Sequence, residues 1–300
     1  MTVRPRRSVL YMPGSNPRAL EKARELPADV LILDLEDAVA PEAKLQARDA
    51  VVKAIQQGFG DREVLVRING LDTRWWVEDI DAAASARPDA VLVPKVSSPR
   101  QLQDLAARLV DMGTDPHVRV WAMMETPLAM LNVGDIAAAA LDSETRLAGF
   151  VMGTNDLAKD TRARLVAGRA PMLPWLMNCL AAARAYGLDI LDGVYNDIGD
   201  AAGFAAECRQ ARDLGFDGKT LIHPRQIEPC KEAFSPTAEE VDAARKIIAA
   251  FDLPENENKA VIQIDGRMIE RLHAEMARRT VAIADAIAKS RQQQPAASVA

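Results

Sequence analysis

Acidic side chains follow several short apolar runs of the sequence. Asp34, Glu36 and Asp37 follow the run VLIL, Glu125 follows AMM, and Asp156 follows FVMGTN. Mg²⁺ is usually held by one or two protein carboxylates together with waters and substrate oxygens. Glu125 and Asp156 close consecutive runs, so they are the best pair of metal ligands. The acids at 34–37 compete for that role, and they could equally orient arginines and waters.

Two cations stand at the ends of other apolar runs. Arg67 can bind a carboxylate or stabilise a developing oxyanion, which would make it both a substrate-binding and a catalytic residue. Its alternative is an internal salt bridge with the acids at 34–37. Lys95 raises the possibility of a Schiff-base aldolase, which needs a lysine desolvated enough to be nucleophilic. Nearby acids would raise its pKa instead, which disfavours that chemistry.

Other polar residues are expected at the same edge of the fold: Asn69, Asn155, Asp192 and His223. Carboxylates crowded at one rim repel one another and lose solvation, so such a collection points to a site rather than to structural charge. A zinc site is not expected, because His117, His223 and His273 lack metal-ligand spacing. His117 is expected at the surface.

The elements that must position these residues recur about every 30 residues, the length of one βα unit. Eight candidate strands are Ser8–Met12, Val30–Leu33, Val64–Ile68, Ala90–Val93, Val118–Met123, Leu147–Met152, Ile190–Gly193 and Gly218–Ile222. Candidate helices between them are Glu42–Gln57, Arg100–Asp111, Met130–Ala140, Leu176–Tyr186 and Ala201–Leu214.

The order of these elements predicts an α/β fold, a (β/α)₈ TIM barrel over residues 1–235. Asn16-Pro17, Ser98-Pro99 and Thr126-Pro127 each pair an N-capping residue with proline, as at the start of a helix. Continuous apolar runs are typical of parallel strands covered on both faces. An open doubly wound sheet fits the pattern too, but no GxGxxG follows the first run.

The pattern changes after the eighth run. Thr237 and Glu240 form a capping box for a helix to about Phe251, and a short strand is expected over Ala260–Ile264. An amphipathic helix then carries its apolar side chains on one face. These are Leu272, Met276, Ile283 and Ile287. We therefore expect a C-terminal segment over residues 236–290 and a disordered tail over 291–300.

Composition bounds the partners and the compartment. The chain has 37 Lys+Arg and 43 Asp+Glu, a net charge of −6, which argues against a general binder of nucleic acid or anionic membrane. No run reaches the roughly 18 apolar residues of a membrane span. Cys179, Cys208 and Cys230 form no disulfide framework. A soluble, cytoplasmic protein is expected.

Blocks along the chain resemble the citrate lyase β-subunit-like acyl-CoA lyases of the HpcH/HpaI aldolase superfamily. Relatives in this group include malyl-CoA, β-methylmalyl-CoA and citramalyl-CoA lyases. The resemblance extends from Arg7 to about Ile287. The matching blocks are RRSVLYMPGSNPRALEKA, VLILDLEDAVAPEAK, VLVRINGLDT, VLVPKV, METPLAML, VMGTNDLA, LDGVYNDIGD and GFDGKTLIHPRQI.

The resemblance implies a Mg²⁺-dependent barrel whose C-terminal segment acts as a lid, in a homotrimer or a hexamer. It places the metal ligands on Glu125 and Asp156 and the substrate-binding arginine on Arg67, with Glu125 also near the substrate. Relatives also carry an acid, often Asp, that reaches into the neighbouring subunit's site, and here that position is Glu270.

Coenzyme A contacts are the second implication of the resemblance. The motif PGxRPxxxEK supplies basic contacts to the coenzyme A phosphates in relatives. Here Asn16 stands at its arginine position, Lys22 is kept, and Arg18 lies two residues later. We therefore expect coenzyme A binding by Lys22, with Arg18 as a substitute.

The implied activity is a carbon-carbon lyase. It would cleave a 3-hydroxy dicarboxylic acyl-CoA, such as malyl-CoA or citramalyl-CoA, into a 2-oxo acid and acetyl-CoA or propionyl-CoA. Two alternatives within the family are a malyl-CoA-type thioesterase and a citrate lyase β subunit acting on an acyl-carrier-protein thioester. A catalytically silent scaffold would require loss of Glu125, Asp156 or Arg67, and all three are present.

Overall fold

The computed structural model describes residues 4–293. In it, eight parallel strands pair in chain order and close into a barrel, with β8 returning to β1. The strands are β1 (Ser8–Pro13), β2 (Val30–Asp34), β3 (Glu63–Arg67), β4 (Ala90–Val93), β5 (Arg119–Met124), β6 (Leu147–Met152), β7 (Asp189–Asp192) and β8 (Gly218–Leu221). The predicted barrel is confirmed, and each predicted strand end agrees with these bounds to within one residue.

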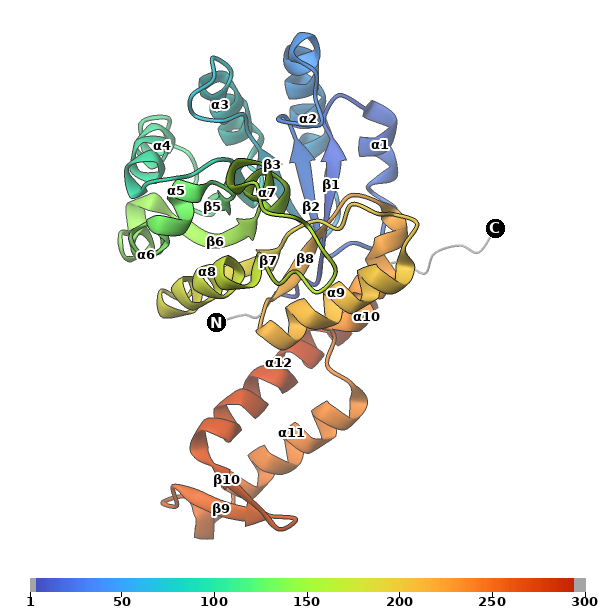
Figure 1. Ribbon diagram of the computed structural model, residues 1–300, viewed down its shortest axis with the longest axis vertical. Helices are drawn as coiled ribbons and strands as arrows, with labels where there is room; N and C mark the ends of the chain where they lie inside the picture. The colour runs from blue at the N-terminus through green and yellow to red at the C-terminus, as the bar shows by residue number, and fades with distance from the viewer. Residues whose placement is uncertain (1–3, 294–300) are drawn as a thin grey trace. The chain divides into compact units, whose positions relative to one another are not determined.

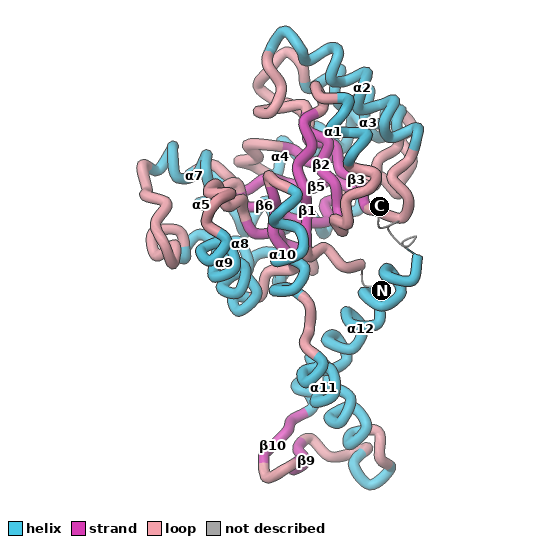
Figure 2. The backbone as a smooth tube through the Cα atoms, turned by 90° about the vertical axis from the view of Figure 1, so that its right-hand side faces the viewer, coloured by secondary structure: helices cyan, strands magenta, loops and turns pink. Residues whose placement is uncertain are grey.

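Ten α-helices among the described residues surround the strands, as Figures 1 and 2 show. They are α1 (Pro17–Lys22), α2 (Lys44–Gln57), α3 (Trp76–Ala86), α4 (Pro99–Asp111), α5 (Pro127–Leu131), α6 (Val133–Ala138), α7 (Thr154–Thr161), α8 (Leu173–Ala185), α9 (Ala201–Leu214) and α10 (Ile227–Phe234). Short 3₁₀ turns are Pro41–Ala43, Ala139–Leu141, Ser143–Thr145 and Pro224–Gln226.

The predicted helix starts are confirmed by their caps. The side chains of Asn16 and Thr126 accept hydrogen bonds from the backbone nitrogens of Ala19 and Ala129. The helix predicted over 130–140 is instead broken at Asn132, whose side chain donates to the carbonyl oxygen of Ser97. The helix α3 was not predicted.

The strand register separates two cores. Val9, Ile32, Leu65, Trp121 and Val151 are among the side chains that fill the barrel interior. Alternate residues of the same strands face outward and pack with the helices in the larger apolar core. Because successive side chains alternate, the residue two positions after an interior side chain also points inward. On several strands this residue lies at the carboxyl end, where barrel enzymes carry their active sites.

The N-terminal end of the barrel is closed by charged side chains. Arg6 donates to Glu63 at 2.6 and 2.8 Å and also pairs with Asp189. The Arg6 guanidinium lies 5.1 Å from the ring centroid of Trp121. These contacts neutralise the bottom of the barrel and leave the opposite end for ligands.

Residues 6–234 form one compact unit, and the described residues from 235 onward form a second with residues 4 and 5. In the second unit α11 (Ala238–Phe251) and α12 (Arg271–Gln293) pack side by side (Figure 1). Between them come a 3₁₀ turn, Pro254–Asn256, and the antiparallel hairpin of β9 (Val261–Ile264) and β10 (Arg267–Glu270).

The second unit bears out part of the sequence pattern. The Thr237–Glu240 capping box is confirmed, and Ile287 is buried as expected. Leu272 and Met276 are 50% and 64% exposed, so the predicted apolar face of α12 is covered only in part. The strand β10 was not predicted, because its sequence RMIE has no long apolar run. Of the predicted tail, residues 294–300 lie outside the described part, and no helix in residues 4–293 is long and apolar enough to cross a membrane.

Candidate active site at the mouth of the barrel

Three predicted site residues face the barrel interior at the carboxyl ends of neighbouring strands. Asp34 and Arg67 are register partners on β2 and β3, and Glu125 directly follows β5. Met123, two residues before Glu125, belongs to the interior cluster, so alternation turns Glu125 inward as well. Asp34, Arg67 and Glu125 are only 1%, 7% and 1% exposed.

Arg67 is held by Asp34. Its Nε and Nη2 donate to the two carboxylate oxygens of Asp34, each at 2.6 Å. Burial alone would raise the pKa of Asp34, but the charge and hydrogen bonds of Arg67 hold it below its usual value. The internal salt bridge considered for Arg67 therefore exists, and it occupies two of the three guanidinium nitrogens.

The third nitrogen, Arg67 Nη1, is less firmly held. It lies 3.0 Å from Oε2 of Glu36 and 3.6 Å from a carboxylate oxygen of Asp37. Its hydrogen-bond acceptor is Sδ of Met123, at 3.9 Å. A thioether is a weak acceptor, so Nη1 is the part of Arg67 that can bind a substrate oxygen.

Glu125 is fixed by the backbone around it. Its Oε1 accepts a 2.7 Å hydrogen bond from the backbone nitrogen of Lys95, which has a positive φ of 54°. A Cβ at Gly153 would lie 2.2 Å from Oε2 of Glu125, so only glycine lets this strand end pass the carboxylate. Both contacts keep the Glu125 side chain in one position.

Asp156 lies in the first turn of α7, and its side chain is 26% exposed. The pKa of Glu125 is raised to about 8, chiefly by burial and then by the charge of Glu36, with a smaller contribution from Asp156; the Lys95 hydrogen bond and the charge of Arg67 act in the opposite direction. A buried carboxylate beside another acid is unfavourable unless a cation or a proton neutralises it.

This donor set fits Mg²⁺, which needs few protein carboxylates and accepts substrate and water oxygens. In residues 4–293 no three His, Cys, Asp or Glu side chains gather into a metal-binding group. Glu125 and Asp156, whose charge acts on Glu125, offer two carboxylates, fewer ligands than the closed sites of structural zinc use.

Glu36 and Lys95 form an ion pair beside Glu125. Nζ of Lys95 donates to Oε1 of Glu36 at 2.6 Å. Burial lowers the pKa of Lys95, but the hydrogen bond and charge of Glu36 outweigh that and raise it. Lys95 is therefore held as an ammonium ion, which disfavours the Schiff-base alternative. Lys44 supports the same loop by donating to the carbonyl oxygens of Leu35 and Glu36 at 2.8 and 2.7 Å.

Two polar residues expected at the mouth serve the fold instead. Asp192 is wholly buried and accepts from Arg169 at 2.7 Å and from Lys219 at 2.8 Å. Its neighbour Leu191 faces the interior, so alternation turns Asp192 toward the helices. Asn69 is bound to Asp79 of α3 through both its backbone and its side-chain nitrogen. Asp192 and Asn69 thus stand at or just after the carboxyl ends of their strands, as expected, but their side chains are taken up by these protein partners.

The remaining expected residues are spread more widely. Asn155 forms a reciprocal amide pair with Asn196, and His223 accepts from the backbone nitrogen of Arg225 as a cap. His117 is half exposed, as expected for a surface residue. The partners of Asn155 and His223 are protein groups, so these two residues shape loops at the carboxyl ends of the strands, whereas His117 precedes β5.

The candidate coenzyme A residues and Glu270 lie on separate elements. Arg18 and Lys22 are exposed and stand four residues apart on α1, so their side chains share one face of that helix. Glu270 ends β10 in the second unit, where it is exposed and its backbone nitrogen donates to Nδ1 of His273 at 3.0 Å.

Tyr11 is a residue at the mouth that the sequence pattern did not single out. It packs against the interior cluster, and the guanidinium carbon of Arg67 lies 4.8 Å from its ring centroid. Its hydroxyl donates to Sδ of Met123 at 3.9 Å. The alternation of Val9 and Tyr11 on β1 is the signal that could have placed it among the inward-facing residues.

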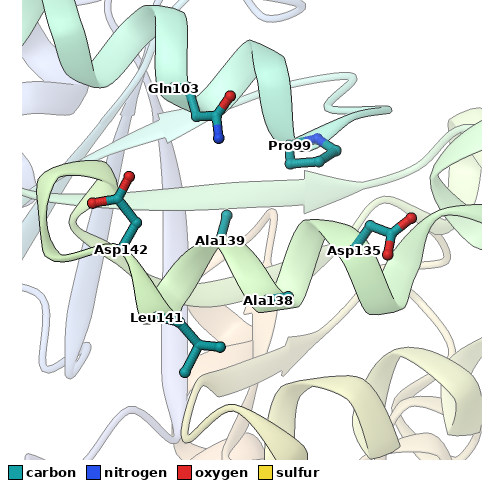
Figure 3. A pocket seen from close by; sticks show the side chains of 7 residues that line it. All are labelled: Pro99, Gln103, Asp135, Ala138, Ala139, Leu141 and Asp142. Atoms are coloured by element: carbon teal, nitrogen blue, oxygen red, sulfur yellow. The ribbon is translucent and has the colours of Figure 1, made fainter.

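A separate hollow of about 580 Å³ lies on the outer helices (Figure 3). Its lining comes from α4, from α6 and from the turn after α6. The lining residues are Pro99, Gln103, Asp135, Ala138, Ala139, Leu141 and Asp142. None of them belongs to the mouth, so this hollow is distinct from the candidate site.

Known proteins share both the sequence and the fold. The family model for HpcH/HpaI aldolase/citrate lyase matches residues 7–224. A (3S)-malyl-CoA thioesterase of Cereibacter sphaeroides is 49% identical over 285 residues, which cover 95% of this chain and 96% of the relative. Citrate lyase subunit beta of Escherichia coli is 34% identical over 273 residues, 89% of each chain.

A solved structure matches nearly the whole chain. It is the protein CitE from Mycobacterium tuberculosis in complex with magnesium, acetoacetate and coenzyme A. The two chains are 30% identical, with a TM-score of 0.75, and the match covers 94% of this chain and 98% of that one.

Proposed function

Because the chain belongs to the HpcH/HpaI aldolase/citrate lyase family, we propose that it is a Mg²⁺-dependent thioesterase acting on a malyl-CoA-type thioester. The observation that carries this choice is the 49% identity to (3S)-malyl-CoA thioesterase over 95% of the chain. The thioesterase, the alternative in the sequence-based prediction, thus takes precedence over the lyase. The geometry at the mouth suits both reactions.

Glu125 and Asp156 would hold the metal ion. Magnesium in the complex of the Mycobacterium tuberculosis protein supports this assignment, and so does the raised pKa of the buried Glu125 carboxyl, to which the charge of Asp156 contributes. When bound, Mg²⁺ supplies positive charge that neutralises the substrate's carboxylate and orients it. Glu125 would then also lie next to the substrate, because both would bind the same metal ion.

Arg67 would stabilise the thioester oxygen. In hydrolysis, a water oxygen bonds to the thioester carbon, negative charge collects on the carbonyl oxygen, and the carbon-sulfur bond then breaks. The proton lost by the water ends on the coenzyme A thiolate. Asp34 holds the other two nitrogens of Arg67. Nη1 lies 3.0 Å from Oε2 of Glu36, and the N–H that it directs at Sδ of Met123 would donate to the oxyanion instead. Glu270 is the proposed proton acceptor or donor.

Coenzyme A would bind to the exposed basic face of α1. Arg18 and Lys22 can each pair with a phosphate, and their spacing of one helical turn lets both contact one ligand. The coenzyme A bound in the Mycobacterium tuberculosis complex supports a coenzyme A thioester as the substrate class.

The second candidate is the carbon-carbon lyase. It is favoured by the 34% identity to citrate lyase subunit beta and by the acetoacetate in the solved complex. In the cleavage direction the substrate hydroxyl loses its proton, the bond between the carbinol carbon and the carbon next to the thioester breaks, and the resulting enolate is protonated. Charge again collects on the thioester oxygen, where Arg67 would act. An acyl-carrier-protein thioester is a variant of this candidate.

Two further features are part of the proposal. We expect residues 236–290 to act as a lid over the mouth, which would exclude water in the lyase reaction and admit the attacking water in the thioesterase reaction. We also expect the chain to assemble into a homotrimer or hexamer. Exposed apolar side chains on the second unit, Leu272 and Met276 among them, are compatible with burial against another subunit.

The experiment is an assay of purified protein with Mg²⁺ and malyl-, β-methylmalyl-, citramalyl- and citryl-CoA. Free thiol and 2-oxo acid are recorded together, for the wild type and for the Glu125→Gln variant purified in the same way. Thiol without oxo acid supports the thioesterase. Oxo acid without thiol supports the lyase, and activity that survives in Glu125→Gln would overturn the metal assignment.

A further inference from the structure

Two hydrogen-bond donors at the mouth point at the same weak acceptor. Oη of Tyr11 and Nη1 of Arg67 each donate to Sδ of Met123, both at 3.9 Å. A thioether sulfur accepts hydrogen bonds poorly, and a methionine side chain rearranges readily. Nη1 also lies 3.0 Å from Oε2 of Glu36, so what a stronger acceptor would gain by displacing the sulfur is the Tyr11 hydroxyl and the N–H that Nη1 directs at Met123.

The ring of Tyr11 is fixed by packing, whereas its hydroxyl makes only a weak hydrogen bond to sulfur. The ring packs against the interior cluster and under the guanidinium of Arg67, with 4.8 Å between the guanidinium carbon and the ring centroid. Asp34 fixes that guanidinium in turn with two 2.6 Å hydrogen bonds. The direction of the hydroxyl relative to Arg67 Nη1 is thus set before any ligand binds.

The surrounding charges keep the hydroxyl protonated. Burial is the main cause that raises the pKa of Tyr11; the charge of Arg67 lowers it, and the carboxylates of Glu125, Asp34 and Glu36 oppose Arg67. A phenol in this state donates a hydrogen bond but does not act as a base near neutral pH.

We propose that Tyr11 is a further catalytic residue whose hydroxyl donates a hydrogen bond to the thioester carbonyl oxygen of the substrate, beside Arg67 Nη1. This inference rests on the proposed function. It holds for hydrolysis and for carbon-carbon cleavage alike, because both reactions collect negative charge on that oxygen. Tyr11 keeps its hydroxyl proton throughout either reaction; it donates a hydrogen bond and transfers no proton.

The test is the Tyr11→Phe variant, which removes the hydroxyl and keeps the ring under Arg67. The expected result is a fall in kcat of about 10²-fold, the usual effect of losing one oxyanion donor, with little change in KM. Mn²⁺ affinity and the thermal unfolding midpoint should equal those of the wild type. The matched control is Tyr186→Phe, since Tyr186 ends α8 just before β7, at the opposite end of the barrel.

Three outcomes would overturn the inference while leaving the proposed function standing. They are full activity in Tyr11→Phe, a loss of activity that follows a loss of stability or metal affinity, and a limb of the wild-type pH profile that disappears in the variant. The last would make Tyr11 a base rather than a donor. A wild-type protein inactive on every thioester would instead overturn the proposed function.

Discussion

Asp34 accepts two hydrogen bonds from Arg67, one from Nε and one from Nη2, each 2.6 Å long. The same carboxylate accepts from the backbone nitrogens of Glu36 at 2.9 Å and Ala38 at 3.1 Å. One buried side chain therefore fixes both the arginine of the candidate site and the loop that carries Glu36. Its role is to position these groups rather than to bind metal.

The Asp34→Asn variant should lose both stability and activity. Removing the charge of Asp34 leaves Arg67 with only Glu36 and Asp37 near Nη1 as counter-charges, and loss of one partner of a buried pair costs about 3 kcal/mol in the free energy of unfolding. Urea denaturation measures this cost. Asp81→Asn is the matched control, because Asp81 pairs with Arg108 at the surface and should have a much smaller effect. Equal effects in the two variants would contradict the role of Asp34.

The Glu125→Gln variant should lose metal binding without losing stability in the absence of metal. Glutamine keeps the oxygen that accepts from the Lys95 nitrogen, and it resembles the protonated carboxyl that the raised pKa favours below about pH 8. Mn²⁺ titration and thermal unfolding in chelator measure the two properties. Asp160→Asn, one turn along α7 from Asp156, is the control and should still bind Mn²⁺.

Mg²⁺ affinity should rise with pH. The pKa of Glu125 in the metal-free protein is raised to about 8, chiefly by burial and then by the charge of Glu36. Below that value Mg²⁺ must displace a proton, so the apparent Kd should fall about tenfold per pH unit and then level off above pH 8. The metal-free protein has the opposite trend, since this group destabilises the fold as pH rises toward 8. An affinity that is flat between pH 6 and 8 would show that Glu125 is already ionised.

The barrel could be predicted because its strands are covered on both faces and read as continuous apolar runs, such as Val30–Asp34. The ends of the same apolar runs located Glu125 and Arg67 at the ends of strands. These runs do not show where Asp192 points, because a run buried on both faces gives no sign of which residues point inward. Only the register, with Leu191 inside the barrel, shows that Asp192 faces the helices.

Other features depend on contacts between distant segments. Tyr11 belongs to an apolar run and looks like a core residue until Arg67 and Met123 are seen around it. The capture of two Arg67 nitrogens by Asp34 likewise depends on the pairing of β2 with β3. Sequence patterns identify candidate side chains. Which of their N–H and O–H groups remain for a substrate depends on the contacts made in the folded chain.

Lys95 should form no covalent adduct with an oxo acid or a thioester. Glu36 accepts a 2.6 Å hydrogen bond from its Nζ, and the raised pKa of Lys95 keeps it protonated and non-nucleophilic near neutral pH. Borohydride treatment during turnover, followed by mass spectrometry, should leave the peptide that contains Lys95 unmodified. A reduced adduct on Lys95 would restore the Schiff-base mechanism.

Glu270 should complete the site of a neighbouring subunit if the proposed lid role is correct. Arg67→Lys and Glu270→Gln chains should each be inactive alone, because lysine cannot reproduce the guanidinium fork and glutamine cannot transfer a proton. In an equal mixture about half of the sites have an intact Arg67, and about half of those receive an intact Glu270 from the neighbouring subunit. About a quarter of wild-type activity should therefore return. Denaturing, mixing and refolding the two variants, then measuring thiol release, tests this. Activity no higher than in the separate variants would mean that Glu270 acts within its own chain or takes no part in the reaction.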